Sequence, residues 1–255
     1  MRDLNGDGCD ELAVGARLAD MGGGVNQGGA YLLFGRGAPT CPNEVEGLLV
    51  REGRQHSHLG ASVATGDITG DGLPELAIGA PLLREEWRAY GGAVILLGED
   101  LVTTPRINAE VLLGHTGTEE QRDSATVWPD ASKQALWRLQ GSAEGSEAGY
   151  GLALIERGAG QLGAVALSER YGSIGGRSGL NLIRIHTVID GGGRLSPEPD
   201  AIIWDETQRP GSLIGEPVSA STSGDALIVG AREGSGVGLD HGSAYVIKLS
   251  QLWAE

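Results

Sequence analysis

Residues 3–16 read DLNGDGCDELAVGA, and residues 67–80 read DITGDGLPELAIGA. The second stretch repeats the first from position 3 to position 67, an offset of 64 residues. In each copy an Asp-rich and Gly-rich bend leads into an apolar run that ends in Gly-Ala. A repeat of this kind indicates an array of similar structural units.

Two weaker copies follow these strong ones. The segment before the second bend, residues 58–64, is echoed at 149–154 and again at 213–219. The apolar runs at 162–167 and 226–231 then match LAIGA in position. Their acidic bends are replaced by the short segments 157–161 and 222–225, so we expect hairpin turns without a ligand there.

Apolar runs of about four to seven residues, bounded by Gly, Asp and Asn, predict β-strands, about four to each unit. The expected fold is all-β: a β-propeller with about four recognisable four-stranded blades of about 64 residues, incomplete at both ends. For the second unit, the expected strands are at Val63, 76–78, 93–97 and 109–113. We expect one domain, 1–255, with blades at 1–51, 52–114, 142–206 and 207–255 and an insertion at 115–141.

Both ends of the repeat array are expected to be open. The first unit begins at its acidic bend with no strand before it, and the last unit ends soon after the apolar run 244–249. The array therefore predicts missing blades, an assembly partner or exposed edges at both ends.

Composition narrows the class of protein further. The 44 glycines disfavour a helical bundle, because glycine costs about 1 kcal/mol relative to alanine inside a helix. The net charge of −15, from 19 basic and 34 acidic residues, makes nucleic acid an unsuitable partner. No apolar run reaches the length of a membrane span, and no hydrophobic export signal is visible at residue 1.

The two acidic bends are candidate calcium sites. Each places oxygen-bearing groups at its first, third, fifth and ninth positions and a backbone carbonyl at the seventh, and Ca²⁺ prefers such hard oxygen ligands. The candidate ligands are Asp3, Asn5, Asp7, Glu11 and the carbonyl of Cys9 in the first bend, and Asp67, Thr69, Asp71, Glu75 and the carbonyl of Leu73 in the second.

Two other interpretations compete with a calcium loop. An EF-hand would need an acidic residue at the twelfth position and a helix on each side, but Val14 and Ile78 stand there in strand-like runs. A solvated turn that binds nothing would leave three convergent carboxylates in each loop without a counter-ion. The calcium interpretation is therefore preferred to both.

These motifs resemble the FG-GAP repeat family, which forms the blades of the integrin α-subunit β-propeller and occurs in many bacterial surface proteins. Leu59-Gly60 and Tyr150-Gly151 stand where that family has Phe-Gly, and residues 14–17 and 78–81 stand where it has Gly-Ala-Pro. Residues 3–11 and 67–75 fit its nine-residue calcium loop, with Glu at the ninth place instead of Asp. The resemblance implies structural calcium, with adhesion or recognition and no catalysis.

The insertion is the second candidate site. In the resembling family the corresponding connection lies on the ligand-binding face, and we expect a small hairpin with a type I turn over 125–137. Trp128 and Trp137 flank that turn and are candidate ligand contacts, because exposed aromatic side chains anchor interfaces. Packing of both over the propeller as a satellite cluster is the alternative. Whether Cys9 and Cys41 form a disulfide stays open.

The sequence favours a non-enzymatic, calcium-stabilised binding or adhesion module of a secreted or cell-surface protein. Its expected partner is a protein or glycan bound on the propeller face, with no nucleic acid and no membrane span. One alternative is a propeller-type hydrolase or lyase with its active site in the propeller mouth. The other is a purely structural spacer in a longer repeat array.

Overall fold

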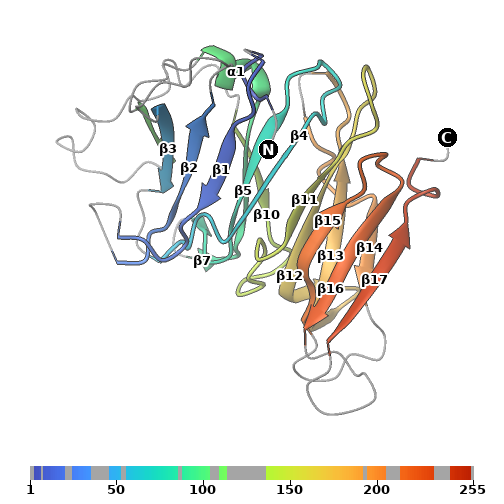
Figure 1. Cartoon of the computed structure of the whole chain (residues 1–255). Helices are drawn as coiled ribbons and strands as arrows, with labels where there is room; N and C mark the ends of the chain where they lie inside the picture. Colours follow the sequence, from blue (N-terminus) through green and yellow to red (C-terminus); the bar gives the residue numbers. More distant parts are fainter. Residues whose placement is uncertain are drawn as a thin grey trace.

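The computed structural model describes residues 3–6, 8–20, 25–35, 46–52, 56–85, 88–103, 109–113, 136–191, 194–204, 213–232 and 242–253. Over these residues the chain is mostly β, and its sheets follow one another in a row from the N-terminal end to the C-terminal end (Figure 1). Within the described residues the sheets do not close into a ring, because sheet one and sheet four lie at opposite ends of the row.

Four sheets form the row. Sheet one contains β1 (Leu12–Gly15), β2 (Gly29–Phe34), β3 (Glu46–Glu52) and β9 (Ala109–Leu113), in that order. Sheet two is ordered β10 (Leu136–Gln140), β8 (Gly92–Leu96), β5 (Glu75–Ala80) and β4 (Ser62–Gly66). Sheet three contains β11 (Leu152–Ile155), β12 (Ala164–Ile174), β13 (Arg177–Thr187) and β14 (Ala201–Trp204), and sheet four contains β15 (Leu213–Ala220), β16 (Ala226–Arg232) and β17 (Ser243–Lys248).

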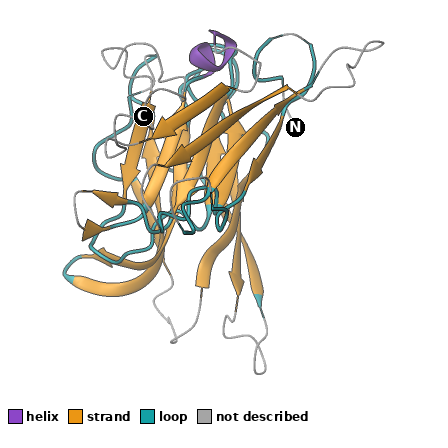
Figure 2. Cartoon of the chain, turned by 90° about the vertical axis from the view of Figure 1, so that its left-hand side faces the viewer, coloured by secondary structure: helices purple, strands orange, loops and turns teal. Residues whose placement is uncertain are grey.

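Two smaller elements complete the described structure. Strands β6 (Arg84–Glu85) and β7 (Arg88–Ala89) form a short antiparallel pair between β5 and β8. The helix α1 (Gly98–Thr103) follows β8 and lies beyond the ends of the strands (Figure 2). Its Leu101 is buried in the same apolar cluster as sheets one and two.

The expected strands of the second unit are confirmed except for the fourth. Residues 109–113 form β9, which pairs in parallel with β3 of sheet one, whereas β10 occupies the fourth place in sheet two beside β8. The physical reason is α1: with Leu101 buried, the chain leaves β8 by a helix instead of a hairpin turn. The predicted insertion at 115–141 therefore includes a strand of the core sheet, since Leu139 of β10 is buried.

Each sheet has two faces, which we name by what they pack against. The N-side face points toward the preceding sheet of the row, and the C-side face points toward the following one. Leu76, Ile78, Val94 and Leu96 on the N-side face of sheet two pack against Ala30, Leu32, Leu48 and Val50 on the C-side face of sheet one. Sheets two and three, and sheets three and four, repeat this contact through separate clusters.

Glycine pairs allow the backbones of neighbouring sheets to approach closely. A Cβ atom added to Gly15 would lie 2.2 Å from the carbonyl oxygen of Gly60, and one added to Gly79 would lie 2.1 Å from that of Gly149. Only a residue without a side chain fits such a contact. The glycines of the repeat therefore set the spacing between successive sheets.

Candidate functional site

The second acidic bend joins β4 to β5 and is organised by Asp67. The Asp67 carboxylate accepts hydrogen bonds from the backbone N–H of Gly70 at 2.7 Å and of Gly72 at 2.9 Å. Both glycines have positive φ, 77° and 90°. An aspartate that bonds to the backbone a few residues further on is a common way to hold a tight turn.

Glu75 closes this bend from inside the protein. Its side chain is fully buried, and it accepts hydrogen bonds from the N–H of Ile68 at 2.8 Å, from the N–H and hydroxyl of Thr69 at 3.3 Å each, and from the N–H of Gly98 at 3.4 Å. Burial, together with the charges of Asp71 and Asp67, raises the pKa of Glu75 from 4.5 to about 7, although the backbone hydrogen bonds lower it. The two aspartates of the bend thus act on the buried carboxyl group of Glu75.

The first acidic bend repeats this arrangement. Glu11 is buried and accepts hydrogen bonds from the backbone N–H of Leu4 at 2.6 Å and from the side-chain amide of Asn5 at 3.0 Å. Asp3 accepts from the N–H of Gly6 at 2.6 Å and of Gly8 at 2.9 Å. Of the predicted ligands, Asp7 lies outside the described residues.

The donor chemistry of these bends fits a hard divalent cation, because carboxylate, hydroxyl and carbonyl oxygens are the ligands that Ca²⁺ takes. The side chains are turned toward backbone N–H groups: Asp71, for example, accepts from Leu73 N–H at 2.8 Å. Among the described residues no three His, Cys, Asp or Glu side chains surround a common point. The assignment of both bends as calcium loops stays a prediction.

The second bend is also bonded to sheet three. The carbonyl oxygens of Ile68 and Gly70 accept hydrogen bonds from the N–H groups of Gly163 at 2.8 Å and Gly160 at 2.9 Å. These two donors lie in the connection between β11 and β12, which contains the short segment 157–161 that replaces the acidic bend in the third unit. A change in the shape of the acidic bend would therefore alter the contact between sheets two and three.

In the fourth unit, the turn between β15 and β16 contains fewer carboxylates than the two acidic bends do. Asp225 accepts hydrogen bonds from the hydroxyls of Ser221 at 2.8 Å and Ser223 at 2.7 Å. The predicted ligand-free turn between β15 and β16 is thus held by serine hydroxyls.

The raised pKa of Glu75 predicts a pH dependence for the calcium-free protein. A carboxyl group with a folded-state pKa near 7 and an unfolded value near 4.5 binds more protons when folded between these pH values. The free energy of unfolding should therefore fall as pH rises from about 4.5 to 7, by up to about 3 kcal/mol from this group. Urea unfolding in EDTA at several pH values measures it.

Glu75→Gln is the matched variant for that measurement, because it removes the titration and retains the size of the side chain. The difference between the wild-type and variant curves isolates Glu75 from the other acids. Parallel curves across this pH range would contradict the assignment of a raised pKa to Glu75.

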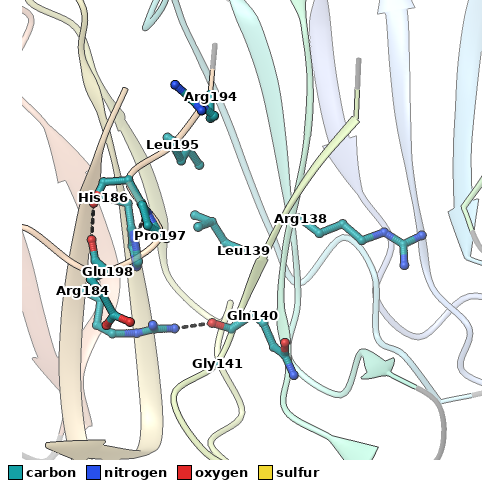
Figure 3. Close-up of a pocket in the computed structure, with 11 residues that line it drawn as sticks. Arg138, Leu139, Gln140, Gly141, Arg184, His186, Arg194, Leu195, Pro197 and Glu198 are labelled. Carbon is teal, nitrogen blue, oxygen red and sulfur yellow. Dashed lines mark hydrogen bonds between the residues drawn. The ribbon is translucent and has the colours of Figure 1, made fainter. Parts of the chain in front are cut away.

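A cavity of about 570 Å³ lies between β10 of sheet two and β13 of sheet three (Figure 3). We call it the inter-sheet groove. Figure 3 shows Arg184 reaching from β13 to the carbonyl oxygen of Gln140 on β10. The residues that line the groove are Arg138, Leu139, Gln140, Gly141, Arg184, His186, Arg194, Leu195, Ser196, Pro197 and Glu198.

Arg184, which lines the inter-sheet groove, belongs to a buried ion pair. The guanidinium of Arg184 contacts the carboxylate of Glu169, whose side chain is fully buried. Glu169 also accepts hydrogen bonds from the N–H and the hydroxyl of Ser142, at 3.0 and 2.5 Å. Because Ser142 follows β10, this network joins sheet three to sheet two.

His186 lies beside this ion pair, two residues further along β13. Its Nδ1 donates a hydrogen bond to the carbonyl oxygen of Ser196 at 2.9 Å, since a carbonyl can only accept. Burial lowers the pKa of His186, so the imidazole is neutral near pH 7. Its Nε2 has no hydrogen-bond partner within the described part of the chain.

The structure describes only part of the segment that carries the two predicted tryptophans. Trp128 lies outside the described residues. The backbone of Trp137 belongs to β10, where it pairs with Ile95, and its side chain is outside the description. Cys41 is likewise outside it, so the question of a disulfide with Cys9 stays open.

The sequence interpretation missed Glu169, Arg184 and His186. A signal was present, because Arg184 and His186 alternate with apolar residues in the strand segment LIRIH, residues 182–186. Charged residues in a run that is otherwise fully buried need partners. That pattern indicates a buried polar contact, although it does not name the partner.

Comparison with known proteins shows which proteins the first two repeat units resemble. The family described as FG-GAP repeat matches residues 2–33 and 59–97. Phosphatidylinositol-glycan-specific phospholipase D from Bos taurus is 40% identical over 99 residues, which cover 36% of this chain and 12% of that protein. Integrin alpha-PS5 from Drosophila melanogaster is 31% identical over 99 residues, covering 38% and 9%, and integrin alpha-3 from Mus musculus is 36% identical over 87 residues, covering 32% and 8%.

The matched segment spans about a tenth of the length of these curated relatives, so the similarity concerns a repeat unit and not a whole protein. Among the described residues, no helix combines the length and the apolar character that crossing a membrane requires. The matched ranges contain both acidic bends and the strands that follow them. The first two units of this chain are repeats of the FG-GAP family, related to those of integrin α subunits and of phosphatidylinositol-glycan-specific phospholipase D.

Proposed function

We propose that this chain is a non-enzymatic binding module in which calcium stabilises the two acidic bends. The observation that carries this proposal is the second bend, where Asp67, Asp71 and a fully buried Glu75 lie in one loop bonded to sheet three. Burial is the main cause of the raised pKa of Glu75, and a cation would offset the smaller contribution that the charges of Asp71 and Asp67 make. Asp67, Asp71 and the carbonyl of Leu73 would hold it, and Glu75 would fix the shape of the loop.

Calcium on this account has a structural role. It would supply positive charge and oxygen coordination at the bend, which in turn is bonded to the turn between β11 and β12. The ligand surface would then be provided by sheets held at a fixed spacing. The FG-GAP resemblance supports this division between structural metal loops and a separate ligand surface.

The inter-sheet groove supports binding more than catalysis. Arg184 and His186 of the groove, with Glu169 bonded to Arg184, are the group that most resembles catalytic residues, and each is engaged in a contact that joins elements of the fold. These contacts fix the three side chains in place, which suits a rigid surface for binding. We propose that a protein or glycan ligand contacts the chain near this groove, beside the β10 strand that carries Trp137.

An extracellular or cell-surface location follows from the same proposal. Calcium in the millimolar range outside cells would saturate even weak loops, whereas binding inside cells would demand a much tighter site. The net charge of −15 supports a partner other than nucleic acid. The enzyme among the relatives shares 12% of its length with this chain, which supports a common repeat and not a common reaction.

Calcium removal tests the proposal. At a calcium concentration of about 100 times Kd, one site adds about 2.7 kcal/mol to the free energy of unfolding. For a chain of this size that corresponds to a rise in Tm on the order of 5–10 °C. Thermal melting in millimolar calcium and in EDTA measures the difference.

Asp71→Ala and Asp225→Ala form a matched pair for this experiment, because each removes one carboxylate from the turn between the first two strands of a unit. Asp71→Ala should lose the part of the calcium-dependent shift that comes from the second bend. Asp225→Ala should retain the whole shift, since its turn is closed by serines. Equal melting temperatures of the wild-type protein in calcium and in EDTA would refute the proposal.

A further inference from the structure

The inter-sheet groove contains a buried hydrogen-bond acceptor that the fold leaves unused. Arg184 and His186 alternate along β13 with Ile183 and Ile185, whose side chains pack in the cluster shared with sheet four. Successive side chains of a strand point to opposite faces, so His186 points toward sheet two and into the groove that it lines. His186 is 2% exposed, and its Nε2 has no hydrogen-bond partner among the described residues.

The protonation of His186 decides what a ligand must offer to Nε2. Nδ1 carries a proton, because it donates to the carbonyl oxygen of Ser196 at 2.9 Å. Burial lowers the pKa of the ring, so near pH 7 Nε2 carries no proton and accepts a hydrogen bond instead of donating one. A ligand with an O–H or N–H group can fill this position, whereas an ionised carboxylate only accepts and cannot.

The charged side chains of the groove favour an uncharged ligand. The guanidinium of Arg184 is paired with the buried carboxylate of Glu169, and that of Arg194 lies 3.0 Å from the carboxylate of Asp190. Figure 3 shows the side chain of Arg138 extending away from the centre of the groove. An anionic ligand would therefore meet guanidinium groups that are already paired or turned away, and it would lose its hydration without gaining a counter-charge.

Other lining residues combine a second acceptor with apolar side chains. The carboxylate of Glu198 is close enough to act on the charge of His186, and it can accept a hydrogen bond from the same ligand. Leu139 and Leu195 pack in one apolar cluster, and Pro197 lines the groove with them (Figure 3). Two acceptors next to apolar side chains suit a sugar ring, because its hydroxyl groups donate while its C–H faces pack on apolar groups.

A sugar suits this groove better than a peptide segment does. An extended peptide offers one backbone N–H per residue, and successive residues are about 3.3 Å apart. A peptide that adds to a sheet as a new strand requires a free edge, but β13 is paired with β12 on one side and with β14 on the other. At this wall of the groove a peptide would therefore make side-chain contacts only.

We propose that the inter-sheet groove binds an uncharged saccharide, with one hydroxyl group donating to Nε2 of His186. The bonds of Nδ1 to Ser196 and of Arg184 to Gln140 hold the groove in shape before the ligand arrives, which reduces the entropy lost on binding. The inference rests on the proposed function, because it names the ligand class of the same binding module. It makes no use of the acidic bends.

Titration of the chain in millimolar calcium tests the ligand class. The probes are lactose, cellobiose and diacetylchitobiose as neutral saccharides, sialyllactose as an acidic saccharide, and a neutral peptide rich in serine and asparagine. At least one neutral saccharide should bind at a single site per chain in isothermal titration calorimetry. Neither sialyllactose nor the peptide should displace it.

His186→Leu removes the acceptor and should weaken the affinity for that saccharide by about fivefold to tenfold, which corresponds to the loss of one hydrogen bond. His186→Gln retains an acceptor oxygen and should retain most of the affinity. His58→Leu is the matched control, because His58 also has a buried nitrogen without a partner among the described residues and a pKa lowered by burial, but it does not line the groove. His58→Leu should bind the saccharide as tightly as the wild-type protein does.

Saccharide derivatives that each lack one hydroxyl group separate a direct contact from a structural role of His186. The derivative without the hydroxyl that donates to Nε2 should bind the wild-type protein about fivefold to tenfold more weakly than the intact saccharide does. His186→Leu should bind the two equally, because the contact is already lost. If circular dichroism shows that His186→Leu fails to fold, the nitrogen NMR resonance of His186 Nε2 in the wild-type protein takes its place. It should shift when the saccharide is added, whereas the resonances of His58 should not.

Four results would overturn the inference: no binding of any neutral saccharide, binding of the acidic saccharide or the peptide alone, wild-type affinity in His186→Leu, or losses from this variant and from deoxygenation that add. Thermal melting in calcium and in EDTA on the same samples separates these failures from a failure of the proposed function. A Tm that depends on calcium without saccharide binding leaves the calcium-stabilised module in place and removes only this ligand class. Equal Tm values in calcium and in EDTA would contradict the proposed function even where a saccharide binds.

Discussion

Gly79→Ala is expected to destabilise the protein by about 3 kcal/mol, a large loss for a change of one methyl group. The new Cβ would lie 2.1 Å from the carbonyl oxygen of Gly149 and 2.2 Å from the hydroxyl of Ser62. The first contact is with the backbone of the neighbouring sheet, so relief requires sheets two and three to move apart. Urea unfolding at equilibrium measures the change.

Gly191→Ala is the matched control, because no heavy atom lies within 4 Å of the position of its Cβ. That substitution should change the free energy of unfolding by no more than about 0.5 kcal/mol. Similar losses for the two variants would show that the spacing of sheets two and three does not depend on the glycine contact. Gly151, whose Cβ would lie 1.9 Å from the carbonyl oxygen of Gly215, extends the test to sheets three and four.

Glu169→Gln is expected to cost about 3–5 kcal/mol, because it leaves the guanidinium of Arg184 buried without its counter-charge. The side chain of Arg184 is 10% exposed and that of Glu169 is 0% exposed, so water compensates only weakly for the lost charge. Ser142 also loses the carboxylate that accepts from its N–H and its hydroxyl. Urea unfolding at neutral pH measures the loss.

The exposed pair of Arg88 and Glu144 provides the control for this effect. Its two side chains are 49% and 56% exposed and the charged atoms are 3.9 Å apart. Glu144→Gln should therefore change stability by less than about 1 kcal/mol. If Glu169→Gln costs no more than Glu144→Gln, the network of Glu169, Arg184 and Ser142 does not stabilise the contact between sheets two and three.

Local patterns in the sequence predicted most of the strands. Short apolar runs and the placing of glycines around the acidic bends located β4, β5, β8, β11, β12, β15, β16 and β17, because these features act over a few residues, whereas β13 and β14 were not predicted. The parallel pairing of β9 with β3 depends on a contact between residues about 60 positions apart, as between Leu48 and Ala109. No local pattern encodes a contact of that kind.

The acidic bends show a second limit of sequence interpretation. Composition and spacing predicted which oxygen donors gather there, but not where each one points. Glu at the ninth position is one methylene longer than Asp, and in both bends it reaches back to bond the start of its own loop. Its direction depends on burial against the strands, which becomes visible only when the sheet is assembled.

The inter-sheet groove marks a third limit. Glu169 and Arg184 come from neighbouring strands of sheet three, and Ser142 and Gln140 come from the end of sheet two. The charged residues were visible in the sequence, whereas their mutual contact depends on how two sheets stack. A sequence with clear repeats therefore predicts its units better than it predicts the contacts between them.

A crystal grown in calcium and measured for anomalous scattering tests the central claim most directly. The account predicts an ion at each acidic bend, and in the second bend oxygen atoms of Asp67, Asp71 and Leu73 should lie about 2.3–2.6 Å from it. Glu75 should remain buried and bonded to Ile68, as in the structure described above. Bends that contain water alone in saturating calcium would contradict the account.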